Sequence, residues 1–216
     1  MKQALLIGTR GGLHDVEVAA QALSRVFEQR YALTVMDERR YPTLTQQDLN
    51  PWDMVMFMPQ GYGAKSCSKT TRALVRYVVW GGCLLSLHCG LITGGAYELD
   101  LLHAARFKGH AAFGLMDYRP GPQAGAHTRQ IGPVCLEDEP YTFDFDPMKQ
   151  TNILLEQDYG CAHWPAAWAH TWAKGKVACV APGHQAKGIL TLAPLFGDIG
   201  DWFDGLISLG QEEKQP

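Results

Sequence analysis

This chain of 216 residues is poor in charge and has no marked excess of either sign. Charged residues make up 19% of the sequence, and the formal net charge is -3. A protein that binds nucleic acid usually carries a basic patch or a clear positive excess. We therefore expect no nucleic-acid partner, whereas a neutral or acidic small molecule remains compatible with this composition.

The sequence also lacks a cysteine framework. None of its six cysteines forms a C-x-x-C pair, so neither a disulfide scaffold nor a local zinc knuckle is indicated. The apolar run at the amino terminus, Ala4 to Ile7, is too short for the apolar region of a secretory signal. These features predict a cytoplasmic protein with reduced thiols.

A membrane span is not expected either. Residues 77–97 contain no Asp, Glu, Lys or Arg over a length that could cross a bilayer. However, five glycines, Ser86 and His88 interrupt the stretch. The interruptions divide it into a helix end, a buried strand and a turn, which is typical of a central strand in a parallel sheet.

Strands and helices are predicted to alternate through the first half of the chain. Short apolar runs indicate strands at 4–8, 33–36, 53–58 and 83–87, and helical spacing of apolar residues indicates helices at 16–30, 68–80 and 93–103. Beyond Phe107, shorter runs between prolines and glycines predict extra strands, at 111–118, 130–136, 153–157, 166–172 and 176–180. A last helix is expected over 194–209. We predict one α/β domain over residues 1–210, with 211–216 as a polar tail.

Alternation of this kind predicts a mostly parallel central sheet that is covered by helices on both faces. Ligands of such sheets bind beyond the carboxyl ends of the strands. The polar residues that follow predicted strands should therefore meet at one edge: His14, Asp15, Gln60, Tyr62, His88, Cys89 and His184. For Asp15 two roles stay open, because it either caps the helix at 16–30 or binds the ligand.

The stretch Cys83 to Gly90, CLLSLHCG, is the central feature of this pattern. An apolar strand that stops at a polar pair and a glycine predicts a tight turn. Such a turn pushes the side chain at its tip out at the edge of the sheet. The candidates for that position are His88 and Cys89.

Several motifs, in their order and spacing, resemble the ThuA-like (trehalose utilisation) family, part of the class I glutamine amidotransferase-like superfamily. They span most of the chain and are His14-Asp15, Gly81-Gly82 with Leu84 to His88, Phe107 with His110, Asp138 to Tyr141, Pro165 to Trp168, Gly175 to Val177 and Gly183-His184. The resemblance implies a flavodoxin-like three-layer sandwich with additional strands in the second half. It also implies a small-molecule sugar or sugar derivative as the partner.

The chain departs from the amidotransferase pattern at the nucleophile. That pattern has cysteine in the middle of G-x-C-x-G, whereas His88 takes the middle position here and Cys89 is displaced by one residue. His184 matches the amidotransferase histidine, but no acidic residue follows two places later. Glutamine hydrolysis is therefore not expected. Gly61 matches the position of a backbone oxyanion donor and is a candidate binding residue, as are Asp15, Gln60 and Tyr141.

Two interpretations of the chemistry remain open at this point. If His14, His88 and His184 converge, they match the ligands of zinc or another divalent metal. Without a metal, His88 and Glu139 would serve as acid and base for proton transfer beside a sugar carbonyl. In either case His88, His184 and Glu139 are the candidate catalytic residues. The Asp138-Glu139 pair also has a simpler interpretation, as a solvated turn.

The first functional hypothesis is an enzyme that hydrolyses, isomerises or eliminates from a sugar or keto-sugar. The alternatives are a hydrolase or thiol-dependent protein that uses Cys89 with His184, and a sugar-binding module without catalysis. A homo-oligomer is compatible with the architecture. The remaining histidines are expected to lie on the surface or to be hydrogen-bonded structural residues, namely His103, His110, His127, His163 and His170. Core packing is expected for Trp164, Trp168 and Trp172 rather than a platform on which a sugar stacks.

Overall fold

The first half of the chain alternates strands and helices, as predicted. The computed structural model describes residues 1–60 and 68–209, so Gly61, Tyr62 and the predicted tail at 211–216 lie outside the described residues. The elements up to the central strand are β1 (Lys2–Gly8), α1 (Val16–Phe27), β2 (Tyr31–Asp37), a 3₁₀ turn (Glu38–Thr43), α2 (Gln46–Leu49), β3 (Met54–Met58), α4 (Ser68–Val79) and β4 (Cys83–Leu87).

The second half is richer in strands, also as predicted. Its elements are α5 (Tyr97–His103), β5 (Ala105–His110), β6 (Gly114–Pro120), α6 (Ala126–Ile131), β7 (Val134–Asp138), β8 (Tyr141–Phe145), β9 (Asn152–Tyr159), β10 (Ala162–Trp172), β11 (Gly175–Val180), α7 (Ala186–Thr191) and α8 (Ala193–Phe203). Among these described residues, no helix has the length and apolar character needed to cross a membrane.

Nine strands of the described chain form one sheet in the order β2-β1-β3-β4-β11-β10-β9-β6-β7. The first five are parallel and follow the strand order of flavodoxin-like sheets, with β11 in the fifth place. The pairings from β11 to β7 are antiparallel. The predicted parallel sheet is therefore observed over its first five strands, and the extra strands of the second half extend its far edge in antiparallel orientation. Strands β5 and β8 pair separately as a small second sheet.

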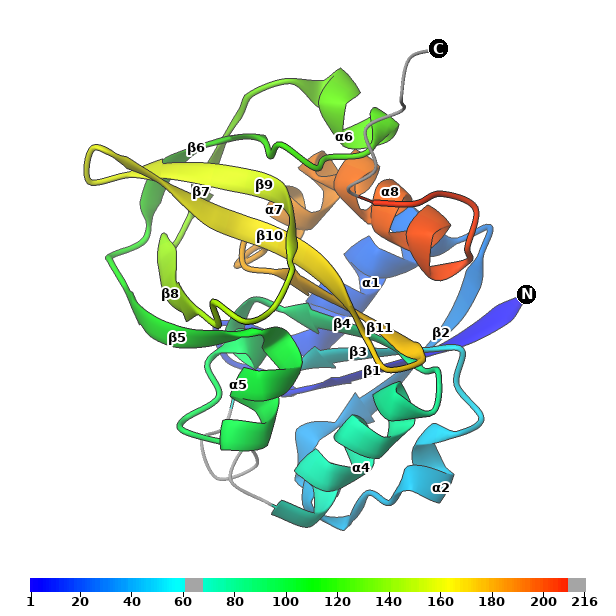
Figure 1. Ribbon diagram of the computed structural model, residues 1–216. Coiled ribbons are helices and arrows are strands. Elements are labelled where there is room, and N and C mark those ends of the chain that lie inside the picture. Colours follow the sequence, from blue (N-terminus) through cyan, green and yellow to red (C-terminus); the bar gives the residue numbers. More distant parts are fainter. Residues whose placement is uncertain (61–67, 210–216) are drawn as a thin grey trace.

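Helices cover both faces of the parallel part (Figure 1). Because side chains alternate along a strand, β1 sends Ala4 and Leu6 to one face and Leu5 and Ile7 to the other. The first pair packs with apolar residues of α1 and α8, and the second packs with those of α4 and α5. This gives the three layers that the resemblance implied.

Local chemistry explains where α1 begins. The Asp15 carboxylate accepts a hydrogen bond from the Glu17 backbone nitrogen at 3.0 Å, so Asp15 is the N-cap residue. This confirms the capping role. The cap sets the start of α1 directly after His14.

Several boundaries differ from the prediction. The strand expected at 130–136 is instead the end of α6 followed by β7, because Gly132, at a φ of 63°, breaks the chain between them. Helix α5 begins at Tyr97 rather than at 93. The last helix ends at Phe203 because Gly205 has a φ of 74°. The β5–β8 pair was not predicted as a separate sheet.

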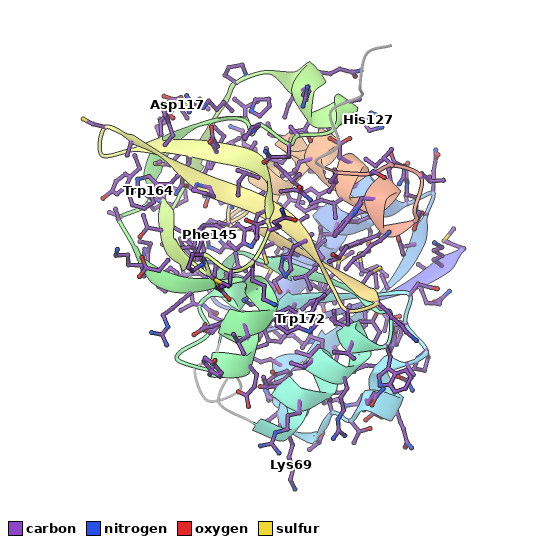
Figure 2. All side chains as sticks on the ribbon, in the orientation of Figure 1. Lys69, Asp117, His127, Phe145, Trp164 and Trp172 are labelled. Atoms are coloured by element: carbon purple, nitrogen blue, oxygen red, sulfur yellow. The ribbon has the colours of Figure 1, made fainter. Side chains whose placement is uncertain are left out.

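Trp164, Trp168 and Trp172 belong to β10, and Figure 2 shows Trp164 and Trp172 toward its two ends. Trp168, between them, is fully buried and donates its indole N–H to the His103 carbonyl oxygen at 2.7 Å. Its ring packs against Phe143 and Phe145. Core packing of Trp168 is thereby confirmed.

Candidate functional site

Strand β4 ends in the predicted tight turn, a 3₁₀ turn over His88–Leu91. His88 has a φ of 39°, a conformation that side-chain-bearing residues rarely adopt and that is often found at functional sites. The turn lies so close to β3 that a Cβ at Gly90 would be 2.1 Å from the Phe57 carbonyl oxygen. Glycine is therefore required at 90, and the turn holds His88 at the edge of the sheet.

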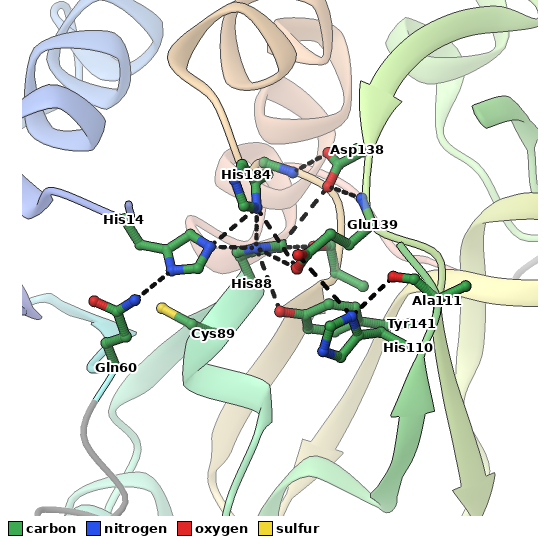
Figure 3. Close-up of polar contacts among 12 residues, drawn as sticks. His14, Gln60, His88, Cys89, His110, Ala111, Asp138, Glu139, Tyr141 and His184 are labelled. Carbon is green, nitrogen blue, oxygen red and sulfur yellow. Dashed lines mark hydrogen bonds and ion pairs between the residues drawn. The ribbon is translucent and has the colours of Figure 1, made fainter. Parts of the chain in front are cut away.

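Three imidazole rings meet at this edge (Figure 3). His14 follows β1, His88 follows β4, and His184 follows β11. The Nε2 atom of His14 lies 3.0 Å from Nδ1 of His184, and Nε2 of His88 lies 3.1 Å and 3.2 Å from these two atoms respectively. The predicted convergence of the three histidines is observed.

Glu139 completes this group of four side chains. Its Oε2 atom lies 3.6 Å from both His88 Nε2 and His184 Nδ1. The four candidate ligand atoms all lie within 4.8 Å of one another. Zinc bonds of about 2.0–2.1 Å in a tetrahedron place neighbouring ligand atoms about 3.3–3.4 Å apart. The five separations given above, 3.0–3.6 Å, fall around that value, so a metal of this size fits the group. We call His14, His88, His184 and Glu139 the histidine cluster.

The hydrogen bonds of His88 set its tautomer. Its Nδ1 atom lies 2.8 Å from the Ala181 carbonyl oxygen, which accepts only from an N–H. Nδ1 is therefore the protonated nitrogen of the neutral ring, and the lone pair of Nε2 faces the cluster. Burial, together with the neighbouring His14 and His184, lowers the pKa of His88 to about 3, although the hydrogen bond to Ala181 acts in the opposite direction. A neutral imidazole with its free nitrogen turned inward is the form that binds metals.

His14 is oriented by Gln60, which is the last described residue after β3. The Gln60 Nε2 atom lies 2.9 Å from His14 Nδ1. The backbone nitrogen of Gln60 donates to Thr9 Oγ1 at 2.9 Å and to Glu38 Oε2 at 2.8 Å. Gln60 thus contacts the ring nitrogen of His14 that faces away from the cluster.

Tyr141 and His110 lie beside the cluster. The Tyr141 ring stacks on His88 with a centroid distance of 4.8 Å, and its hydroxyl lies 3.3 Å from His88 Nε2. Burial raises the pKa of Tyr141 far above its ordinary value, and the Glu139 carboxylate adds to this effect. His110, expected to be structural, has its Nδ1 atom 3.9 Å from Glu139 Oε1. It therefore lies at the edge of the site.

The Asp138-Glu139 pair is not a solvated turn. Asp138 is fully buried, and the Glu139 side chain is only 16% exposed. Burial raises the pKa of Asp138, although hydrogen bonds from the backbone nitrogens of Gly183, Glu139 and His184 act in the opposite direction. The sequence suggested a solvated turn because acidic pairs usually face water, and these backbone donors explain the exception.

Cys89 lies outside the histidine cluster. Its side chain is buried and its thiol lies 3.3 Å from the Met58 carbonyl oxygen, to which it donates. The His88 ring takes the tip of the turn, as the register of the sequence predicted. Of the candidate binding residues, Gln60 and Tyr141 contact members of the cluster, whereas the Asp15 carboxylate caps α1.

Phe113 is a neighbour of the site that sequence analysis missed. It lies between β5 and β6, is 40% exposed, and has its ring centroid 4.8 Å from that of His184. No motif surrounds it, so no local signal could have identified it. In contrast, His103, His127 and His163 hydrogen-bond to Ser86, Asp201 and Asp158 respectively, in keeping with their predicted structural roles.

Solved structures with this fold include ThuA-like proteins. A protein described as ThuA-like from Parabacteroides merdae matches with a TM-score of 0.73 and 13% identity, over 98% of this chain and 92% of that one. One from Bacteroides uniformis matches with a TM-score of 0.66 and 14% identity, over 92% and 91%. A cold-adapted β-galactosidase from Rahnella sp. R3 matches with a TM-score of 0.68 and 15% identity, over 94% of this chain but 31% of the enzyme.

At these identities, the solved structures establish a shared fold alone. No curated protein matches the sequence. The model of the ThuA family, described as trehalose utilisation, matches residues 3–194. That range includes every member of the histidine cluster. The chain therefore belongs to the ThuA family.

Proposed function

We propose that this protein is an enzyme of carbohydrate metabolism whose histidine cluster holds a divalent metal such as zinc. The observation that carries the proposal is the approach of three imidazole nitrogens to within 3.0–3.2 Å of one another. With its Nδ1 proton directed at Ala181, His88 presents a lone pair to the other two rings. A cation among these atoms would be bound by that lone pair, with His14, His184 and Glu139 as the further ligands.

Proton transfer is the task that suits the surrounding side chains. A bound divalent metal would polarise a carbonyl or hydroxyl oxygen of a sugar. Glu139 has one carboxylate oxygen at the cluster and the other near His110, so it is placed to accept a proton and pass it outward. Tyr141 keeps its proton at neutral pH because its pKa is raised, which suits it to donate a hydrogen bond.

The proposed substrate is a neutral sugar or keto-sugar, which would be hydrolysed, isomerised or subjected to elimination. The family description, trehalose utilisation, supports a carbohydrate. So does the occurrence of this fold within a β-galactosidase, although it makes up less than a third of that enzyme. The exposed ring of Phe113 beside His184 offers an apolar face of the kind on which sugar rings stack.

Metal content and turnover test the proposal together. We expect the purified protein to bind one zinc per chain, measured by elemental analysis and by calorimetric titration of chelator-treated protein. Trehalose, other disaccharides and their oxidised keto forms would be screened by NMR with and without zinc. Turnover should disappear with chelator and return with metal. Full turnover in metal-free protein would remove the metal from the proposal, and sugar binding without turnover would favour a binding module.

A further inference from the structure

Asp138, at the end of β7, is a buried carboxylate surrounded by the backbone of the site. It is fully buried. Its Oδ2 atom accepts a hydrogen bond from the Gly183 backbone nitrogen at 2.7 Å, and its Oδ1 atom accepts one from the Glu139 backbone nitrogen at 2.8 Å. Figure 3 shows the carboxylate between these two segments, with His184 and Glu139 projecting from them toward His88.

The segment from Ala181 to His184 also orients His88. The Ala181 carbonyl oxygen accepts the His88 Nδ1 proton at 2.8 Å, and Asp138 Oδ1 lies 3.9 Å from the same nitrogen. Holding Gly183 in place therefore holds both His184 and the hydrogen-bond acceptor of His88. The φ of Gly183, 131°, lies outside the range that other residues favour, which explains why glycine occupies this position.

We infer that Asp138 is a positioning residue that sets the geometry of three members of the histidine cluster, namely His88, Glu139 and His184. The inference rests on the proposed metal site. Asp138 touches no ring nitrogen at hydrogen-bond distance and acts through the backbone. Groups behind metal ligands typically change metal affinity by about 10–100-fold when they are removed.

The carboxylate matters here because both of its oxygens accept. In Asp138→Asn, one acceptor becomes an NH₂ group that faces a backbone N–H, so two donors meet and one segment must move. Side-chain volume is almost unchanged, which limits the effect on packing. The variant therefore tests the hydrogen bonds that anchor the ligand-bearing segments, with little change in the packing of the core.

Asp198, on α8, provides a matched control. It is also fully buried, and its carboxylate accepts hydrogen bonds from the backbone nitrogens of His127 at 3.2 Å and Thr128 at 2.8 Å. Asp198→Asn creates the same conflict between donors, in the contact between α6 and α8 rather than at the cluster. A merely structural role predicts the same behaviour for both variants.

The first measurement is zinc affinity of the full chain, together with the visible spectrum of the cobalt(II)-substituted protein. We expect Asp138→Asn to bind zinc about 10–100-fold more weakly and to change the cobalt spectrum. Asp198→Asn should lower the melting temperature without changing either property. Equal zinc affinity and identical cobalt spectra in the wild type and Asp138→Asn would overturn the inference.

Amide hydrogen exchange decides the point without any metal. In metal-free protein, Asp138→Asn should accelerate exchange at Gly183 and Glu139, whereas Asp198→Asn should accelerate it at His127 and Thr128. Unchanged exchange at Gly183 and Glu139 would overturn the anchoring role. If the wild type instead binds no zinc while the exchange pattern is as expected, the proposed metal site fails and the anchor stands.

Discussion

The histidine cluster and the hydrophobic core each contain a fully buried histidine, and the two residues differ in what their ring nitrogens face. His88 and His103 are each 1% exposed, and burial lowers the pKa of each to about 3. His88 directs Nε2 at His14 and His184, whereas His103 directs Nε2 at the Ser86 hydroxyl, 2.8 Å away. Burial and a low pKa therefore do not identify a site. The convergence of ring nitrogens distinguishes the cluster from the core.

The largest difference is expected when His88 in the cluster and His103 in the core are replaced in separate variants. We expect His88→Asn to weaken zinc binding by more than about 100-fold, because it removes a ligand, while asparagine tolerates the positive φ at this position. His103→Gln should keep zinc binding and lower the melting temperature. Zinc titration and thermal unfolding of both variants provide the check. An equal loss of zinc affinity in the two variants would contradict the distinction between His88 as a ligand and His103 as a core residue.

The buried histidines of the core should make the stability of the folded protein depend on pH. His103 has a folded pKa of about 3 and His170 one of about 4, both mainly because burial disfavours the charged ring. The unfolded chain takes up protons below about pH 6.5, and the folded chain does not, so stability is full above pH 6.5 and is lost as the pH falls toward 4.

At pH 5 the loss amounts to about 2 kcal/mol for each of these histidines. Denaturant unfolding at pH 7 and pH 5, in metal-free protein, measures it. His103→Gln should lose about 2 kcal/mol less than the wild type over this interval. An identical pH dependence in both proteins would mean that His103 does not stay neutral in the folded state.

A smaller effect is expected behind His14. Gln60 contacts the outer nitrogen of this ring, so Gln60→Leu should weaken zinc binding by roughly tenfold. Gln60→Glu is the matched variant. The amide nitrogen of Gln60 faces His14 Nδ1 as a donor, whereas a carboxylate only accepts, so glutamate places the proton on Nδ1 and leaves the Nε2 lone pair toward the cluster. We expect it to retain wild-type zinc affinity in calorimetric titration. A Gln60→Leu variant with unchanged affinity would contradict the orienting role.

The sequence located the histidines of the cluster because each one follows a parallel strand, and carboxyl ends of parallel strands meet at one edge. Glu139 and Tyr141 come from the antiparallel half, for which no comparable rule exists, and only the family resemblance pointed to them. Asp138 was misjudged because its role depends on Gly183, 45 positions away in the chain. Local patterns carry no record of such a contact. The sequence predicted extra strands in the second half but not their antiparallel direction, because strand direction depends on long-range pairing.

Cys89 provides the smallest expected effect and the sharpest test of the thiol alternative. It neighbours His88 in the chain, yet its thiol is 1% exposed and donates to the Met58 carbonyl oxygen rather than facing His184. The thiolate is the reactive form, and a shielded thiol bound to a carbonyl oxygen is protected from alkylation. Iodoacetamide at neutral pH should therefore label the exposed Cys135 and Cys161 in the native protein, and Cys89 only after unfolding. Cys89→Ser should leave zinc affinity unchanged. Rapid labelling of Cys89 in the native protein would instead show a reactive thiol beside the histidine cluster. The functional contrast between His88 and Cys89 would then fail.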